Sequence, residues 1–471
     1  MSLWEQGWVG THFGGANLSD ERRVRRVMTL ASAFSESPGS SIPQLFERPY
    51  DIKAAYNLFK HPEATPESLQ AGHRGLVKER LNAPGTVLLL EDTTELSWSN
   101  HQEIEGLGPV GNGSEHRQGF LLHSVLAVRW TSSSLETGRR PPLDVLGIAD
   151  QQYYIRKPIP MGEADQDWQR RQKRPRESQL WEKATHRLGP APVQVRWVRV
   201  CDRGADIYEF LRGCLEVGHG FVVRASQDRA LLQPKGRLFE QARQAAAIGS
   251  FELQLRSRPR NPARTARLSL SAAPITLQSP QRPGYSKGGL APIDCAVVRI
   301  WESHPPNGCE PLEWILLTDL QVSDFEQAIT CALQYATRWL IEEFHKALKT
   351  GLGAERLQLE SAHRLFAAIS VMSVVALRLL ELKERVRAEP NGPASEAGLE
   401  PFELRVLAKR LNRELSTTSE VALAIGRLGG HMNRKADGLP GFLTLWRGMI
   451  KLQALVAGAR LGLQFRDLGN D

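Results

Sequence analysis

The stretch YATRWLIEEFHKALKTGLGAER, Tyr335–Arg356, combines aromatic, basic and acidic side chains. Taking Arg338 as the zero direction of a helix with about 100° per residue, Lys349 lies at about 20°. Glu342 and Tyr335 follow at about 40° and about 60°. The other side of this helix is apolar and predicts a core-facing stripe, formed by Leu340, Ile341, Phe344 and Leu348. The pattern therefore predicts a core-packed helix that carries one narrow polar strip.

A carboxylate flanked by Arg and Lys along such a strip is what a site for a metal ion and a phosphate group needs. An ordinary ion pair between Arg338 and Glu342, with Lys349 extending to solvent, explains the same strip equally well. This stretch alone leaves both interpretations open.

Length and composition place the chain among folded proteins with several domains. A chain of 471 residues is too long for one compact core, so two to four domains are expected. Hydrophobic residues make up 41% and charged residues 24%, which excludes a disordered chain. The net charge of +8 permits a polyanionic partner without requiring one.

Cysteine spacing and hydropathy indicate the cellular compartment in which the protein is expected. The five cysteines are scattered, and no pair has zinc-finger spacing, which indicates a reduced intracellular protein. The most apolar segment, Leu365–Leu377, is too short to span a bilayer and predicts a buried helix. We therefore expect a cytoplasmic protein without a membrane partner.

The N-terminal segment LSDERRVRRVMTLASAF, Leu18–Phe34, predicts an amphipathic helix capped by Ser19. Arginines cluster opposite its apolar stripe, with no acidic residue one turn later: Arg22, Arg23, Arg25 and Arg26. This cluster favours a phosphate-facing surface, and a solvated helix face is the alternative. A second helix ends before Pro62, and Thr65 is expected to cap a third, which completes a small helical domain.

From about residue 86 the residue pattern predicts strands that alternate with helices. The segments 86–98, 119–130, 193–213 and 220–226 predict an α/β sheet with active groups at strand ends. Pieces rich in Arg, Pro and Gly at about 228–316 look like an inserted β region, and the C-terminal part turns helical again. The basic tract Asp167–Ser178 is expected to be a DNA-contacting loop or an ordinary surface loop.

Three acids stand where chemistry could use them: Asp92 and Asp202 at the ends of apolar strands, and Glu342 on the polar strip. Oxygen ligands without nearby His or Cys favour Mg²⁺ or Mn²⁺. Two such ions held by three carboxylates can support in-line attack on a phosphodiester. Each acid also has a plain explanation, since Asp92 can cap a turn and Asp202 can pair with Arg203.

The spacing Tyr-x2-Arg-x3-Glu-x6-Lys in Tyr335–Lys349, together with LLLEDTTELSW and VCDRGADIYEFL, resembles the bacterial DDE transposases with a Y-R-E-K signature. These stretches closely resemble the transposon-five type within the insertion-sequence-four family. The resemblance extends over nearly the whole chain. It implies an α/β fold with a ribonuclease-H-like catalytic core that is interrupted by a β insertion and flanked by N- and C-terminal helical domains. The expected boundaries are 1–72 for end binding, 73–385 for catalysis, with the insertion at about 228–316, and 386–471 for dimerisation.

The same resemblance implies roles for single residues. Asp92, Asp202 and Glu342 match the family's metal ligands, expected to hold two Mg²⁺ or Mn²⁺ ions. The other matching positions are expected to contact DNA, with Trp314 stacking a flipped base: Tyr335, Arg338, Lys349, Trp314, Arg224, Arg22, Arg23, Arg26 and Lys60. Gly204 stands where the nearest-looking relatives have an acid.

The resemblance therefore implies a cut-and-paste DNA transposase that nicks DNA, forms and opens a hairpin, and transfers the strand; the hairpin step rests on the resemblance and Trp314, not on the three acids. Its expected partners are double-stranded transposon-end DNA, target DNA and a second copy of the chain assembled on DNA. No nucleotide cofactor is expected, and the protein is placed at the bacterial nucleoid. A nuclease of the same fold without strand transfer, and a catalytically silent end-binding protein, are the alternatives.

Overall fold

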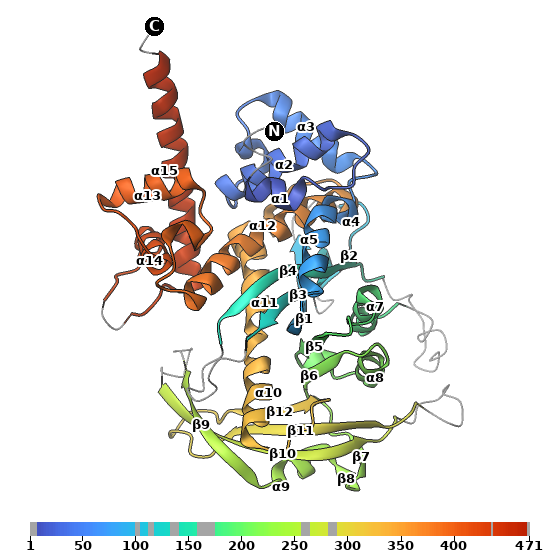
Figure 1. Ribbon diagram of the computed structural model, residues 1–471. Helices are drawn as coiled ribbons and strands as arrows, with labels where there is room; N and C mark the ends of the chain where they lie inside the picture. The colour runs from blue at the N-terminus through green and yellow to red at the C-terminus, as the bar shows by residue number, and fades with distance from the viewer. Residues whose placement is uncertain are drawn as a thin grey trace.

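The computed structural model describes residues 7–98, 104–111, 117–131, 141–157, 175–255, 264–280, 290–434 and 437–468. One mixed sheet of twelve strands forms the centre, and helices flank it (Figure 1). The predicted α/β class is therefore confirmed at the level of a large central sheet with flanking helices.

The first half of the sheet combines an antiparallel meander with two parallel strands. β1 (Gly85–Trp98), β3 (Gln118–Trp130) and β4 (Leu143–Tyr154) pair antiparallel. β5 (Val195–Cys201) and β6 (Gly220–Arg224) then run parallel to β1, which gives the order β4-β3-β1-β5-β6. The short β2 (Gly108–Pro109) pairs with β3.

The inserted β region continues the same sheet. β12 (Glu313–Thr318) pairs antiparallel with β6, and β11 (Ile293–Glu302) pairs with β12. Beyond them lie β10 (Arg264–Leu277), β9 (Ala247–Leu255), β7 (Ala230–Gln233) and β8 (Gly236–Arg237), with α9 (Leu238–Gln244) after β8. The insertion thus shares its backbone hydrogen bonds with the strands of the first half.

Side-chain alternation along the sheet separates two apolar layers. Leu88 and Leu90 of β1 pack in a cluster with α10 (Phe325–Thr337), α11 (Trp339–Lys346) and α12 (Ala362–Ala388). Cys201 of β5 faces the other way, with α7 (Gln179–Leu188) and α8 (Tyr208–Glu216). Because alternate residues point to opposite faces, Asp92 shares the α11 side of β1, whereas Glu91 shares the α7 side.

The predicted helix over Tyr335–Arg356 is not continuous. α10 ends at Thr337, α11 begins after Arg338, and a π-helical turn covers Ala347–Gly351. The core-facing stripe is confirmed, since its four side chains are at most 2% exposed: Leu340, Ile341, Phe344 and Leu348. A π turn adds one residue to the repeat, so positions after it do not follow the 100° rule of an ideal helix.

Helices at both chain ends gather around α12. The N-terminal group comprises α1 (Trp8–Phe13), α2 (Glu21–Glu36), α3 (Pro49–Lys60), α4 (Pro66–Leu69) and α5 (Ala71–Leu81). The C-terminal group comprises α13 (Pro401–Leu411), α14 (Thr418–Leu428) and α15 (Phe442–Leu468). Figure 1 shows the two groups on either side of the upper end of α12, with the inserted strands at the far end of the molecule.

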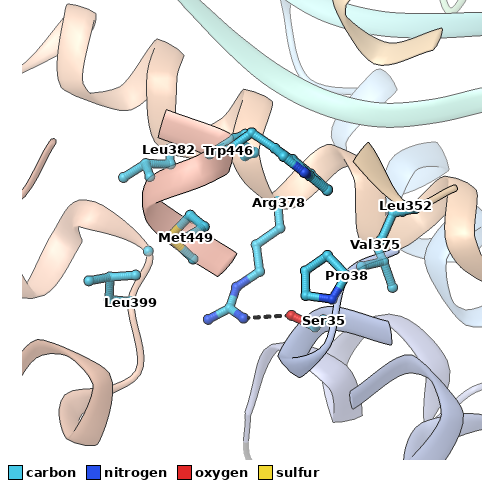
Figure 2. Close-up of a pocket in the computed structure, with 11 residues that line it drawn as sticks. Ser35, Pro38, Leu352, Val375, Arg378, Leu382, Leu399, Trp446 and Met449 are labelled. Carbon is cyan, nitrogen blue, oxygen red and sulfur yellow. Dashed lines mark hydrogen bonds between the residues drawn. The ribbon is translucent and has the colours of Figure 1, made fainter. Parts of the chain in front are cut away.

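Arg378 of α12 joins the two groups. Its Nη1 donates to Ser35 Oγ of α2 at 2.8 Å, and its Nη2 donates to Glu403 Oε2 of α13 at 2.8 Å. Figure 2 shows this arginine in a pocket between Pro38 and Met449 of α15.

The apolar segment Leu365–Leu377 lies within α12, which is longer than expected because Leu379, Leu380 and Leu382 continue the buried surface. Over its full length, α12 is the one helix among the described residues that passes a length and hydropathy test for a membrane span. However, 83% of its most apolar window is buried inside the protein, which confirms a buried helix.

The helix caps in the N-terminal group differ in one place from the expectation. Thr65 caps α4, with Pro66 at its first position, as predicted. The cap of α2 is Asp20, whose side chain accepts the Arg22 N–H at 2.8 Å. Ser19 does not cap because its hydroxyl donates to Glu63 Oε2 at 2.7 Å.

Candidate active site

Two of the three predicted acids stand side by side on neighbouring strands. The parallel register pairs Glu91 of β1 with Cys201 of β5, so Asp92 and Asp202 follow as the next pair. Neighbouring strands lie about 4.8 Å apart, which brings both carboxylates to one point of the sheet. The prediction that Asp92 ends its strand is wrong, because β1 continues to Trp98 in pairing with β3. Asp202 does follow the last residue of β5, where it accepts the Gly204 N–H at 2.8 Å.

Glu342 reaches the same place from α11, which packs against β1. Arg338 stands between Glu342 and Asp92. Its Nη2 donates to Glu342 Oε1, and its Nη1 lies 3.8 Å from Asp92 Oδ2. The Arg338 side chain is 15% exposed, so its guanidinium is a largely buried counter-ion for two carboxylates.

The charges of the three acids act on one another. Burial raises the pKa of Asp92 to about 6, and the negative charges of Asp202 and Glu342 add to that rise. The Thr93 N–H and the Arg338 guanidinium oppose it without cancelling it. A carboxylate destabilised by like charges is stabilised by a cation placed beside it.

The donor chemistry suits a hard divalent cation, since the three acids offer only oxygen. Among the described residues, however, no three His, Cys, Asp or Glu side chains lie close enough together to hold an ion as they stand. Arg338 stands between Asp92 and Glu342 instead.

Sequence reasoning missed His345, which lies one turn after Glu342. Its Nδ1 is 3.9 Å from Asp92 Oδ2, and the side chain is 7% exposed. Burial lowers the pKa of His345 to about 3, and the positive charges around it add to this effect, so the imidazole is neutral. Its spacing of three residues from Glu342 is the signal that identifies it.

The remaining polar-strip residues connect the acids to the inserted strands. The Tyr335 ring packs edge-on against Trp314 of β12, with centroids 5.2 Å apart, and the Arg338 guanidinium lies 6.0 Å from the Tyr335 ring. Tyr335 is only 5% exposed, so it faces the core more than the polar strip predicted. Arg224, at the end of β6, donates from Nη2 to the Glu313 carbonyl at 3.1 Å.

Lys349, on the π turn, binds back to β1. Its Nζ donates to the Glu95 carbonyl at 2.7 Å and lies 3.4 Å from Glu355 Oε1. The structure thus brings five of the predicted residues to one region around β1, β5 and α11: Asp92, Asp202, Glu342, Arg338 and Lys349. Trp314 and Arg224 lie beside it on the adjoining strands.

Two protein-family models match the chain, one at each end. A family described as transposase DNA-binding matches residues 5–64, and one described as the transposase Tn5 dimerisation domain matches residues 374–469. The chain belongs to the Tn5-type transposases of the IS4 family. DNA and a second copy of the chain are therefore partners of this transposase.

The matched DNA-binding segment of the transposase contains the arginine-rich helix α2. No acidic residue follows these arginines one turn later, but two of them have acidic partners from other parts of the chain. Arg23 Nη1 lies 3.0 Å from Glu63 Oε2, and Arg26 Nη1 lies 2.8 Å from Asp51 Oδ1. These partners come from distant parts of the chain, so the search one helical turn away could not find them. Arg22 and Lys60 are exposed on the same helical group.

The predicted basic tract of the transposase lies largely outside the described residues, because only Pro175–Ser178 of Asp167–Ser178 is described. In that part, Arg176 N–H donates to Gln179 Oε1 at 3.0 Å at the start of α7.

Proposed function

We propose that this transposase carries out cut-and-paste transposition with a ribonuclease-H-like catalytic core. Support for the core comes from the strand order β4-β3-β1-β5-β6, with three antiparallel strands followed by two parallel ones. Support for the chemistry comes from the position of the acids, since Asp92 and Asp202 follow one another across β1 and β5 while α11 presents Glu342.

Asp92, Asp202 and Glu342 would hold two Mg²⁺ or Mn²⁺ ions. When bound, such ions neutralise charge on a phosphodiester and favour a nucleophilic water or hydroxyl for in-line attack. Arg338 then exchanges its carboxylate partners for a DNA phosphate, because its guanidinium fork suits both. Lys349, on the π turn that follows α11, would offer a second cation to the bound DNA strand.

The reaction proceeds through changes of nucleophile at one site. Water attacks the phosphodiester at the transposon end and frees a 3′-hydroxyl. This hydroxyl attacks the opposite strand and forms a hairpin, a second water opens the hairpin, and the freed end joins target DNA. Trp314 supports the hairpin step, because an aromatic ring next to Tyr335 and Arg338 can stack an unpaired base.

The single observation that carries this proposal is that Asp92 and Asp202 follow side by side on β1 and β5 while Arg338 contacts both Asp92 and Glu342. Asp92→Asn and Glu342→Gln should bind transposon-end DNA as the wild type does and lose nicking, measured by gel shift and by release of a labelled strand. Asp319→Asn is the matched control, since Asp319 also follows a strand end but binds Arg196 and the Phe221 N–H. Nicking by both acid variants at the wild-type rate would overturn the assignment.

Strand transfer requires its own assay, because a nuclease shares the nicking step. Precut ends with free 3′-hydroxyls should be joined to a plasmid by the wild-type protein. Nicking without joining would make the protein a nuclease of the same fold.

A further inference from the structure

A fully buried ion pair lies behind the acids. Glu91 and Arg199 both have side chains that are 0% exposed. Arg199 Nε donates to Glu91 Oε2 at 2.8 Å, and Arg199 Nη2 contacts the same oxygen. The remaining guanidinium nitrogen, Nη1, donates to Thr185 Oγ1 of α7 at 2.8 Å. The ion pair therefore joins β1 to β5, and Thr185 joins it to α7.

His123 of β3 extends this contact to a third strand. Its Nε2 lies 2.9 Å from Glu91 Oε1, and its Nδ1 lies 2.8 Å from Thr93 Oγ1. The His123 ring is 0% exposed and packs edge-on against Trp181, with centroids 4.9 Å apart. Glu91, His123 and Arg199 together form a cluster, here called the buried triad, that links β3, β1 and β5.

The buried triad lies at the level of the catalytic acids but on the opposite face of the sheet. Glu91 directly precedes Asp92, and Cys201, its partner in register, directly precedes Asp202. His123 is in register with Thr93, the residue that follows Asp92. The triad therefore lies directly behind the backbone of both aspartates, on the face of the sheet opposite to their carboxylates.

Stability alone does not explain the triad. Removing two charges from water is costly, and apolar side chains of similar volume in place of a buried ion pair are often neutral or stabilising. A planar Arg–carboxylate fork does, however, fix distance and orientation more tightly than apolar packing. The geometry thus favours a role in precision over a role in stability.

We propose that Glu91, His123 and Arg199 are positioning residues that hold Asp92 and Asp202 at the separation that nicking requires. This inference rests on the proposed function of the two aspartates as ligands of divalent ions. Outer contacts of this kind commonly change metal affinity or activity by about 10- to 100-fold.

The test is an apolar replacement of the whole triad, Glu91→Leu with His123→Leu and Arg199→Met, which leaves no charge unpaired. The control replaces the ion pair Arg264–Glu302, which spans 2.8 Å in the inserted strands, by Met and Leu. Binding of Mn²⁺ to the free full-length protein is followed by electron paramagnetic resonance, next to nicking of transposon-end DNA and the melting temperature.

For the triad variant we expect about tenfold weaker Mn²⁺ binding and about 100-fold slower nicking, with wild-type melting temperature and DNA affinity. The control variant should match the wild type in Mn²⁺ binding and nicking. Wild-type Mn²⁺ affinity and nicking in a folded triad variant would overturn the positioning role alone. The proposed function fails, and the inference with it, if the wild-type protein does not nick transposon-end DNA and Asp92→Asn binds Mn²⁺ as tightly as the wild type.

A second variant covers the case in which the apolar triad does not fold. Arg199→Lys keeps the charge that neutralises Glu91 but loses the planar fork. It should nick about tenfold more slowly at an unchanged DNA affinity, with a higher Mn²⁺ requirement. An unchanged rate and Mn²⁺ requirement in this folded variant contradict the proposal.

Discussion

At the scale of single residues, Arg338 stabilises a site that is rich in negative charge. It contacts Asp92 and Glu342 at once, in the position where a divalent cation would relieve the same repulsion. The protein without DNA therefore already contains an internal cation. If the acids bind a divalent ion, as proposed, that ion and Arg338 would compete for the same two carboxylates.

This competition gives a prediction for Arg338→Gln. Removal of the guanidinium should strengthen Mn²⁺ binding by the free protein on the order of tenfold, because a nearby positive charge is lost. Nicking should fall, since the same side chain is expected to bind a DNA phosphate. Mn²⁺ titration with paramagnetic resonance measures the first effect. Arg212→Gln serves as the control, because Arg212 pairs with Glu216 on α8. Weaker Mn²⁺ binding in Arg338→Gln would contradict the competition.

The raised pKa of Asp92 predicts that the stability of the folded protein depends on pH. Its pKa rises from 3.8 to about 6 on folding, so the folded state takes up a proton more readily than the unfolded state. Stability therefore falls as pH rises from about 4 to about 6, and the ionised group opposes folding above that range. Asp92→Asn, which stays neutral, should raise the free energy of unfolding at pH 8 by on the order of 2–3 kcal/mol.

Urea unfolding in the presence of a chelator measures this effect. The gain from Asp92→Asn should shrink as the pH is lowered from 8 towards 4.5, because the wild-type carboxyl becomes neutral in the folded state. A variant that is no more stable than the wild type at pH 8 would show that burial and the neighbouring acids do not raise the pKa of Asp92.

Residue-level prediction succeeded where a local pattern carried the information. The 3.6-residue period identified Arg338 and Glu342 as neighbours, and they are bonded in the structure. Glu63 and Asp51 could not be assigned to Arg23 and Arg26, because those pairs depend on helix packing. The roles of the three acids in metal binding stay predictions.

At the scale of elements, the pairing of β12 with β6 makes the inserted strands part of the central sheet. Strand texture predicted β pieces between about 228 and 316, and the structure has strands there. The local residue pattern could not show that β12 hydrogen-bonds to β6, since strand order depends on long-range contacts. Val222 and Val223 of β6 are 0% exposed, and β12 covers the edge that they occupy.

Deletion of residues 228–318 is therefore expected to unfold the protein. Loss of β12 leaves the edge of β6 open and removes the buried Leu316 and Leu317 from both apolar layers. The deletion variant should be largely insoluble and lack a cooperative melting transition in circular dichroism. Replacement of the 304–310 connection by a two-residue turn is the control and should keep the fold, because it leaves the β11–β12 pairing intact. A soluble, cooperatively melting deletion variant would mean that the insertion is a separable unit.

At the scale of the whole molecule, α12 and α15 connect the candidate site to both ends of the chain. Arg378 of α12 binds the N-terminal and C-terminal groups. Trp446 of α15 packs against Gly351, where a Cβ atom would lie only 2.5 Å from the indole ring. Gly351 ends the π turn that carries Lys349, so the matched dimerisation segment contacts the element that presents a predicted DNA ligand.

The last turns of α15 leave apolar side chains in solvent. Leu461 is 51% exposed and Phe465 is 72% exposed, and their spacing of four places them on one helix face. Exposed apolar faces of this kind mark contact surfaces, and these residues lie within the match to the Tn5 dimerisation domain.

We predict that Leu461→Glu with Phe465→Glu reduces the amount of the paired complex, which contains two chains and two DNA ends, by about tenfold or more, because two charges would be buried. The melting temperature and the affinity for a single end should stay at wild-type values, since neither side chain is buried in the monomer. Sedimentation of the protein with transposon-end DNA measures the paired complex, and Leu232→Glu, at a 43% exposed position on β7, is the control. A paired complex at the wild-type level would place the dimer contact on another surface of the C-terminal helices.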